Sequence, residues 1–199
     1  MNNARLKTVL PCLLALTVIA VMTGAAEFSG EREIIFPEIT AVAIGALIAP
    51  VQPWNTSRPR LFASITAMSI MGVLLTRYVP VPIALKIPLA FACAALGLMI
   101  SKTGFVPMIS ACVLPVILGT ETFIYTASVA VMTGIILIMQ YILERFGLHS
   151  PREYVPGRTD RRTILFWLKH TAIIAAVSVV PALTRRNVFY SSASYRGLC

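Results

Sequence analysis

Seven apolar stretches follow one another along the chain, separated by short polar segments. The five longer stretches cover 9–26, 61–75, 83–100, 122–143 and 164–183, and the two shorter or interrupted ones cover 34–51 and 105–118. A helix that crosses a bilayer needs about 20 apolar residues. Within lipid only helices and closed barrels satisfy every backbone polar group, and these stretches lack the alternation of barrel strands. The sequence therefore predicts an all-α, polytopic membrane bundle.

Composition supports this class and excludes two others. The chain is 57% hydrophobic and 13% charged, whereas a soluble domain has about 25% charged residues. Its net charge of +9 does not indicate nucleic-acid binding, because the basic residues lie between apolar stretches rather than on one polar face. We expect a transmembrane domain over 1–143, a basic cytoplasmic connection over 144–163, and a weak seventh apolar stretch with a polar, truncated tail over 164–199.

A short phrase occurs twice, seventy residues apart, within the two short stretches. Its copies read Pro37-Glu38-Ile39-Thr40-Ala41 and Pro107-Met108-Ile109-Ser110-Ala111. The shift relates residues 9–75 to 79–145, two units of three segments each. An odd number of segments makes the second unit enter the membrane from the other side, as in the inverted repeats of transporters. The alternative is a plain bundle of six or seven helices. The expected helix breaks are Pro37, Pro50, Pro107 and Pro115.

Charge between the stretches predicts the orientation. With a cytoplasmic N-terminus, one side collects Arg5, Lys7, Arg58, Arg60, Lys102, Arg145, Arg152, Arg158, Arg161, Arg162 and Lys169. The other side collects Glu27, Glu31, Glu33 and Glu121 with Arg32, Arg77 and Lys86. Loops rich in Lys and Arg stay in the cytoplasm, so we expect a cytoplasmic N-terminus in a plasma (inner) membrane. Alternatively, residues 1–26 are a signal peptide that ends at small residues.

Glu38 is the most informative ionisable residue, because it lies near the start of a short apolar stretch. A charge at membrane depth costs about 2.5–3.5 kcal/mol on insertion scales, so such a residue faces a cavity or a partner. Glu38 is then a candidate for proton coupling or cation coordination. Alternatively, it lies at the interface and stabilises a helix N-terminus.

The other candidates are polar residues at the ends of the short stretches. Thr40 and Ser110 would line two half-helix ends, which attract anions, or would form ordinary hydroxyl bonds within the bundle. Lys102 would draw an anion inward or serve as a topology signal. In the proline-rich loop, Gln52, Asn55 and Arg58 would lie at the mouth of a pathway. Alternatively, that loop is structural, with Trp54 as an interfacial anchor and Arg58 and Arg60 at lipid headgroups.

Signatures of catalysis and of metal binding are missing from the sequence. His149, His170 and Asp160 lack metal-ligand spacing, and there is no phosphate-binding loop, nucleophile elbow or zinc-protease helix. The cysteines show no paired or C-x-x-C spacing and read as small hydrophobic residues. We expect neither an enzyme nor a metal or cofactor.

Two loops resemble the HPP family of small integral membrane proteins, over roughly residues 36–143. The first carries Gln52-Pro53-Trp54-Asn55, and the second runs over 102–119 with its prolines. Phe105-Val106-Pro107 stands where the family has His-Pro-Pro, so only Pro107 keeps the signature and the histidine is missing. The resemblance implies a compact helical membrane domain and, for family members, nitrite uptake.

These features favour a small transporter or permease for a small solute, such as an inorganic anion like nitrite. Its pathway would lie between the segments that begin at Pro37 and Pro107. We expect membrane lipids, a small anion or proton, and a second copy of the chain as partners. The alternative is a non-transporting membrane scaffold or accessory subunit whose basic connection binds lipid or a protein.

Overall fold

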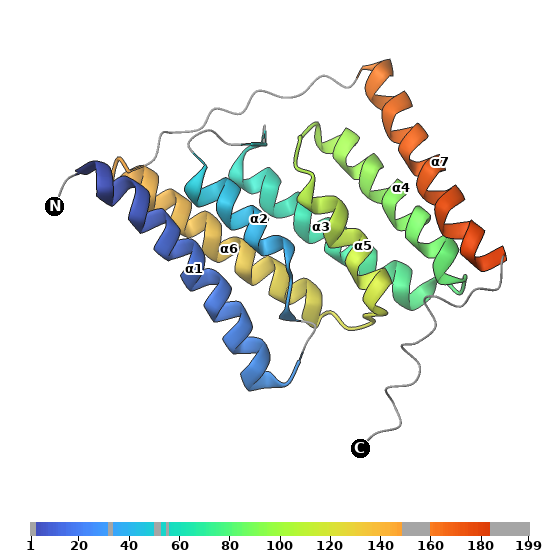
Figure 1. Cartoon of the computed structure of the whole chain (residues 1–199), viewed down its shortest axis with the longest axis horizontal. Coiled ribbons are helices and arrows are strands. Elements are labelled where there is room, and N and C mark those ends of the chain that lie inside the picture. The colour runs from blue at the N-terminus through green and yellow to red at the C-terminus, as the bar shows by residue number, and fades with distance from the viewer. Residues whose placement is uncertain (1–2, 32–33, 50–52, 55, 149–159, 184–199) are drawn as a thin grey trace.

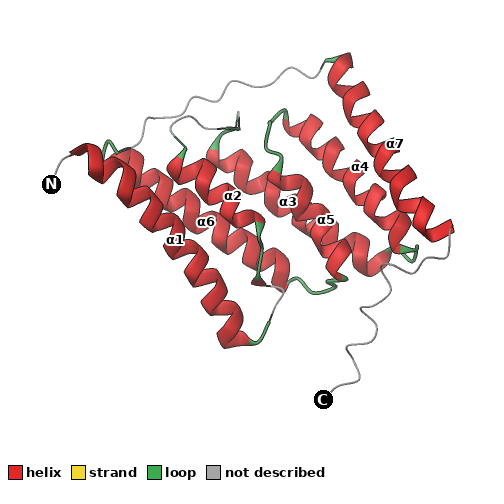
Figure 2. Ribbon diagram, viewed as in Figure 1, coloured by secondary structure: helices red, strands yellow, loops and turns green. Residues whose placement is uncertain are grey.

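The protein is an assembly of helices (Figure 2). The computed structural model describes residues 3–31, 34–49, 53–54, 56–148 and 160–183, and this part contains no strand. The helices are α1 (Asn3–Ser29), α2 (Glu38–Ala43), the π-helical η2 (Ile44–Ile48), α3 (Arg58–Tyr78), α4 (Ile83–Ser101), α5 (Pro107–Leu118), α6 (Ile124–Arg145) and α7 (Arg161–Leu183). The predicted all-α membrane bundle is confirmed.

Four helices are long and apolar enough to cross a membrane. They are α1 from Val9, α3, α4 and α6, and they match four of the five longer apolar stretches. The fifth stretch lies within α7. The two short stretches form the short apolar helices Glu38–Ile48 and Pro107–Leu118. The chain is therefore a multi-pass integral membrane protein.

Local sequence explains where the short helices begin and end. Pro37 lies immediately before α2, and Pro107 is the first residue of α5, where a missing N–H costs no helical hydrogen bond. α5 ends at Gly119 in the left-handed conformation, with φ of 69°, which glycine adopts without strain. Pro115, in contrast, does not break a helix, because α5 continues through it to Leu118.

Successive helices run in opposite directions. In Figure 1, α1, α3, α5 and α7 run downward, whereas α2, α4 and α6 run upward. The segment before α2 enters from the lower edge and the segment before α5 from the upper edge. α6 ends and α7 begins at the edge where α1 begins, so both ends of the 144–163 connection lie on the N-terminal side.

The packing of the helices before α7 has a regular pattern if α2 and η2 are taken as one helix. α4 packs on α5 as α1 packs on α2 and η2, and α3 packs on α5 as α6 packs on α2 and η2. α3 also contacts α4, and α6 contacts α1. Two further contacts, between α2 and α5 and between α3 and α6, complete the arrangement. The principal contact of α7 is with α4.

Candidate functional site: the junction of the two short helices

The two short helices are too short to cross the bilayer alone. α2 with η2 covers Glu38–Ile48, and α5 covers Pro107–Leu118. At 1.5 Å per residue they are about 16–18 Å long, whereas the hydrocarbon core is about 30 Å thick. They run in opposite directions, and α2 contacts α5. Non-helical backbone next to such helices must find partners within the protein.

The segment before α2 finds these partners on α6 and α1. The hydroxyl of Ser128 in α6 donates to the carbonyl oxygen of Ile34 over 2.7 Å. The backbone N–H of Phe36 donates to the sulfur of Met22 in α1 over 3.3 Å. α1 is thus part of the packed core, to which it also contributes Ala15 and Val18.

Tyr125 in the first turn of α6 joins the segment before α2 to the body of α5. Its ring packs edge-on against Phe36 with centroids 5.8 Å apart, and both side chains are fully buried. Its hydroxyl donates to the carbonyl oxygen of Ala111 over 3.4 Å. That oxygen lacks its usual helical donor because Pro115, four residues later, has no N–H. Tyr125 therefore supplies the hydrogen bond that Pro115 removes.

Trp54 makes the reciprocal connection, from the segment before α5 to the body of η2. Its ring packs edge-on against buried Phe105 with centroids 4.9 Å apart. It also lies against Gly45, where an added Cβ would come within 2.3 Å of the indole. The expected interfacial anchor is therefore wrong, because Trp54 is 8% exposed and lies in the core. A proline-rich loop with a tryptophan looks the same in sequence whether it lies at headgroups or folds inward.

Glu38 is the ionisable residue at this junction. It is half-buried, and its Oε2 atom is buried without a hydrogen-bond partner in the protein. Glu38 lies two residues after Phe36, whose ring packs against Tyr125. Buried carboxylate oxygens normally have partners, so this oxygen is available to a proton, a cation or water.

The structure describes three of the remaining predicted site residues, Thr40, Ser110 and Lys102. Thr40 is half-buried in α2, and the hydroxyl of Ser110 donates to the carbonyl oxygen of Pro107 over 2.9 Å. The Ser110 bond is an ordinary hydroxyl bond within a helix, as in the alternative interpretation of this residue. Lys102 is exposed at the end of α4 with φ of 50°. Pro50, Gln52 and Asn55 lie outside the described residues.

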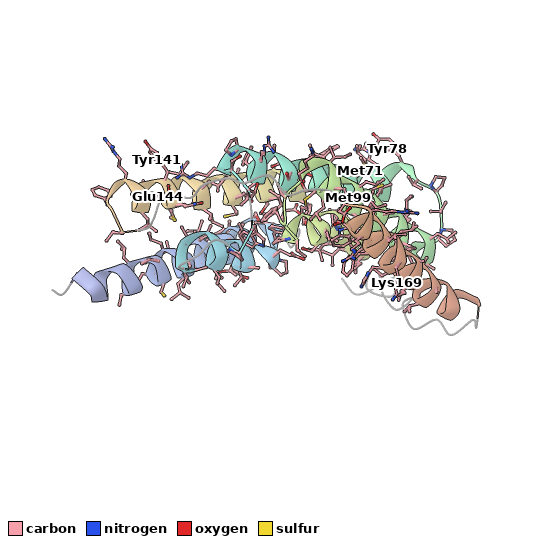
Figure 3. The ribbon with its side chains drawn as sticks, turned by 90° about the horizontal axis from the view of Figure 1, so that it is seen from above. Met71, Tyr78, Met99, Tyr141, Glu144 and Lys169 are labelled. Atoms are coloured by element: carbon pink, nitrogen blue, oxygen red, sulfur yellow. The ribbon has the colours of Figure 1, made fainter. Side chains whose placement is uncertain are left out.

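Arg58 forms an ion pair that links the start of α3 to the end of α6. Its Nη2 donates to Oε2 of Glu144, whose Oε1 accepts from Nε2 of Gln140 over 3.0 Å. The guanidinium also lies 5.3 Å from the centroid of the Tyr141 ring. Tyr141 and Glu144 lie near the same end of α6 (Figure 3). Arg58 therefore has structural partners. The side chain of Arg60 is exposed.

Sequence reasoning missed the polar residues of α6. Thr126, Thr133 and Gln140 are buried, and each has a buried side-chain oxygen without a partner in the protein. Such an oxygen costs about 1–3 kcal/mol. The signal was present in the sequence, because the three residues recur every seven positions within an apolar stretch.

Among the described residues, no three His, Cys, Asp or Glu side chains converge into a group that could hold a metal ion. Comparison with known proteins gives no relative: no family model, no curated protein and no solved structure matches the chain significantly.

Proposed function

We propose that this protein is a small membrane transporter whose pathway lies at the junction of α2 and α5. The observation that carries the proposal is the pair of short, oppositely directed helices in contact within a frame of long helices. Helices of this kind build binding sites near the membrane midplane in transporters.

The proposal includes an inverted repeat of two three-helix units, α1 to α3 and α4 to α6. If each helix of one unit is matched to its equivalent in the other, the α1–α2 contact corresponds to the α4–α5 contact. The α6–α2 contact corresponds in the same way to the α3–α5 contact. The α1–α6 contact corresponds to the α4–α3 contact. Because helix directions alternate along the chain, equivalent helices of the two units run oppositely, as an inverted repeat requires.

The aromatic pairs support the same exchange. Phe36 precedes α2 and packs against Tyr125, which also contacts α5. Phe105 precedes α5 and packs against Trp54, which also contacts η2. Each pair therefore joins the entrance of one short helix to the body of the other. These aromatic contacts position the two short helices relative to each other.

The substrate we propose is a small inorganic anion such as nitrite. This choice rests on the resemblance to the HPP family, and membership of that family is part of the proposal. Glu38 is proposed to couple transport to a proton, since its buried carboxylate oxygen has no protein partner. Thr40 and Ser110 are proposed to line the pathway beside it.

The proposed orientation places the N-terminus in the cytoplasm, in the plasma (inner) membrane. Four of the described cations, Arg58, Lys102, Arg145 and Arg161, lie at helix ends on the N-terminal side. The opposite side holds Glu27, Glu31 and Glu121 together with two cations, Arg77 and Lys86. This asymmetry agrees with the positive-inside rule. We further propose a homo-oligomer, with exposed apolar faces of the helices shared between lipid and the second copy.

Uptake into liposomes tests the proposal. The full chain is reconstituted and nitrite entry is followed with an inward proton gradient and without one, with chloride as the comparison anion. We expect nitrite entry above that of protein-free liposomes, accelerated by the gradient in the wild type but not in Glu38→Gln. Gradient-driven entry in Glu38→Gln equal to the wild type would exclude Glu38 as the coupling residue.

The rival function is that of a scaffold or accessory subunit. It predicts no entry of either anion above background, with stable binding of the basic connection to anionic lipid. Wild-type protein that is folded and monodisperse but gives no flux would favour this rival.

A further inference from the structure

A line of buried polar side chains runs along one face of α6. Thr126, Thr133 and Gln140 are spaced seven residues apart and are 8%, 0% and 2% exposed. Seven residues make almost two helical turns, so the positions drift only about 20° per step. At 1.5 Å per residue the line is about 21 Å long, which is a large part of the hydrocarbon thickness.

The oxygens on this line lack the partners that hydroxyls in membrane helices usually have. Elsewhere in the protein, the hydroxyl of Thr76 donates to the carbonyl oxygen of Gly72 over 2.9 Å, and that of Thr17 donates to Leu13 over 2.8 Å. Thr126 Oγ1, Thr133 Oγ1 and Gln140 Oε1 are buried and have no hydrogen-bond partner in the protein. Buried polar atoms without protein partners are the usual binding sites of internal water.

A carboxylate lies at each end of the line. Thr126 follows Tyr125, whose ring packs against Phe36, two residues before Glu38. Gln140 donates to Glu144 over 3.0 Å, and Glu144 pairs with Arg58 of α3. The line therefore connects the carboxylate at the short-helix junction with a carboxylate at the N-terminal edge.

α3 adds a further hydroxyl between these ends. α3 and α6 run in opposite directions, and the pair of Arg58 with Glu144 fixes their relative level. Thr66, eight residues beyond Arg58, thus lies between the two ends of the line. Its Oγ1 is buried without a partner. Thr66 is one turn beyond Phe62, whose ring would lie 3.8 Å from a Cβ on Gly134.

We propose that Thr66, Thr126, Thr133 and Gln140 hold a file of water molecules that carries protons between Glu144 and Glu38. This inference rests on the proposed function, because it supplies the protons that Glu38 is proposed to couple. Bridging a step of about 10.5 Å between successive side chains of the line requires about three hydrogen-bonded waters at 2.7–2.8 Å per oxygen pair. Each water passes one proton onward and receives another, so the net result is the movement of one proton.

The ends of the file suit this role. At the N-terminal edge, a proton from water binds the carboxylate of Glu144 and weakens its pairing with Arg58, whose guanidinium is still held by the Tyr141 ring. At the other end, the proton reaches the free oxygen of Glu38.

The titratable or charged groups described on the helices packed against α2 and α6 are Cys12, Glu27, Arg58, Arg60, Arg77, Tyr78, Cys112, Tyr125, Tyr141, Glu144 and Arg145.

Thr133→Val tests the file because it keeps the side-chain shape and removes the hydroxyl. The full chain is reconstituted in liposomes that contain a pH-sensitive dye, and proton entry is recorded under a clamped membrane potential, with and without nitrite. We expect proton entry in Thr133→Val to fall to that of protein-free liposomes. Thr76→Val is the matched control, since Thr76 is a buried threonine whose hydroxyl already has a helical partner, and it should retain wild-type proton entry.

Thermal stability separates this role from a structural one. Thr133→Val should melt close to the wild type, because it keeps the side-chain shape and breaks no hydrogen bond within the protein. Loss of proton entry without loss of stability supports the file. Thr126→Val serves as the second variant if Thr133→Val does not reach the membrane.

Two results would overturn the inference: wild-type proton entry in Thr133→Val and Thr126→Val, or no proton entry in the wild type under either condition. Nitrite entry at equal pH on both sides decides the proposed function separately. If nitrite does not enter but protons do, and Thr133→Val stops them, the transport of nitrite is wrong and the proton file stands.

Discussion

The crossing of α3 and α5 depends on Gly72, and Gly72→Ala measures how closely these helices approach. A Cβ at this position would lie 2.3 Å from the carbonyl oxygen of Cys112 and 3.0 Å from both its carbonyl carbon and Cγ of Pro115. Two of these three atoms belong to backbone, which cannot turn aside as a flexible side chain can. The helices would have to separate by about 1 Å to restore ordinary contact distances.

Overpacking of this kind costs about 1–3 kcal/mol. Because the nearest atoms are backbone, we expect Gly72→Ala to lose about 2–3 kcal/mol. For a chain of this size, that loss corresponds to a fall of roughly 4–12 °C in the melting temperature. The measurement is thermal unfolding of the detergent-solubilised protein. The protein that remains folded after heating to each temperature is quantified by size-exclusion chromatography.

Gly134→Ala in α6 is the control, since it makes the same change in the middle of another long helix. Its Cβ would lie 3.8 Å from the nearest atom, in the Phe62 ring, and alanine favours helix over glycine by about 0.8–1 kcal/mol. We expect it to be neutral or stabilising. A melting temperature for Gly72→Ala at or above that of Gly134→Ala would refute the close α3–α5 crossing.

Two further predictions concern the junction and the orientation. Tyr125→Phe leaves the carbonyl oxygen of Ala111 without its donor, so thermal unfolding should show a loss of about 1 kcal/mol in the free energy of unfolding. This is the low end of the cost of a buried acceptor without a partner, because the bond is 3.4 Å long. Unchanged stability would mean that Tyr125 does not replace the bond removed by Pro115. A cysteine introduced at Glu31 should react with an impermeant thiol reagent from outside intact cells, and reaction only from the cytoplasmic side would reverse the proposed topology.

Much of the fold follows from the sequence because burial in lipid leaves few alternatives. Apolar length predicted the four long helices, and Pro37 and Pro107 marked the starts of the short ones, where proline costs no helical hydrogen bond. Pro115 was misread as a break. A proline inside a membrane helix is tolerated when a neighbouring group binds the freed carbonyl, and Tyr125 does so here from a different helix.

The candidate site was less predictable because it depends on contacts between distant segments. Phe36 and Tyr125 are 89 residues apart in sequence, and neither differs locally from any other buried aromatic residue. Trp54 was placed at the interface by its residue type, whereas the glycine at position 45 leaves room for its ring in the core. Glu38 is a candidate that the sequence alone offers, because a carboxylate inside an apolar stretch is costly wherever it lies.

The central claim is that a water-accessible pathway reaches the junction of α2 and α5. Accessibility of Glu38→Cys, in a chain whose four native cysteines are replaced by alanine, tests it most directly, with Ile39→Cys as the control because Ile39 is fully buried. We predict that a small, charged thiol reagent labels Glu38→Cys but not Ile39→Cys in sealed liposomes, and that nitrite slows the labelling. Labelling of Glu38→Cys only after detergent solubilisation would contradict the pathway.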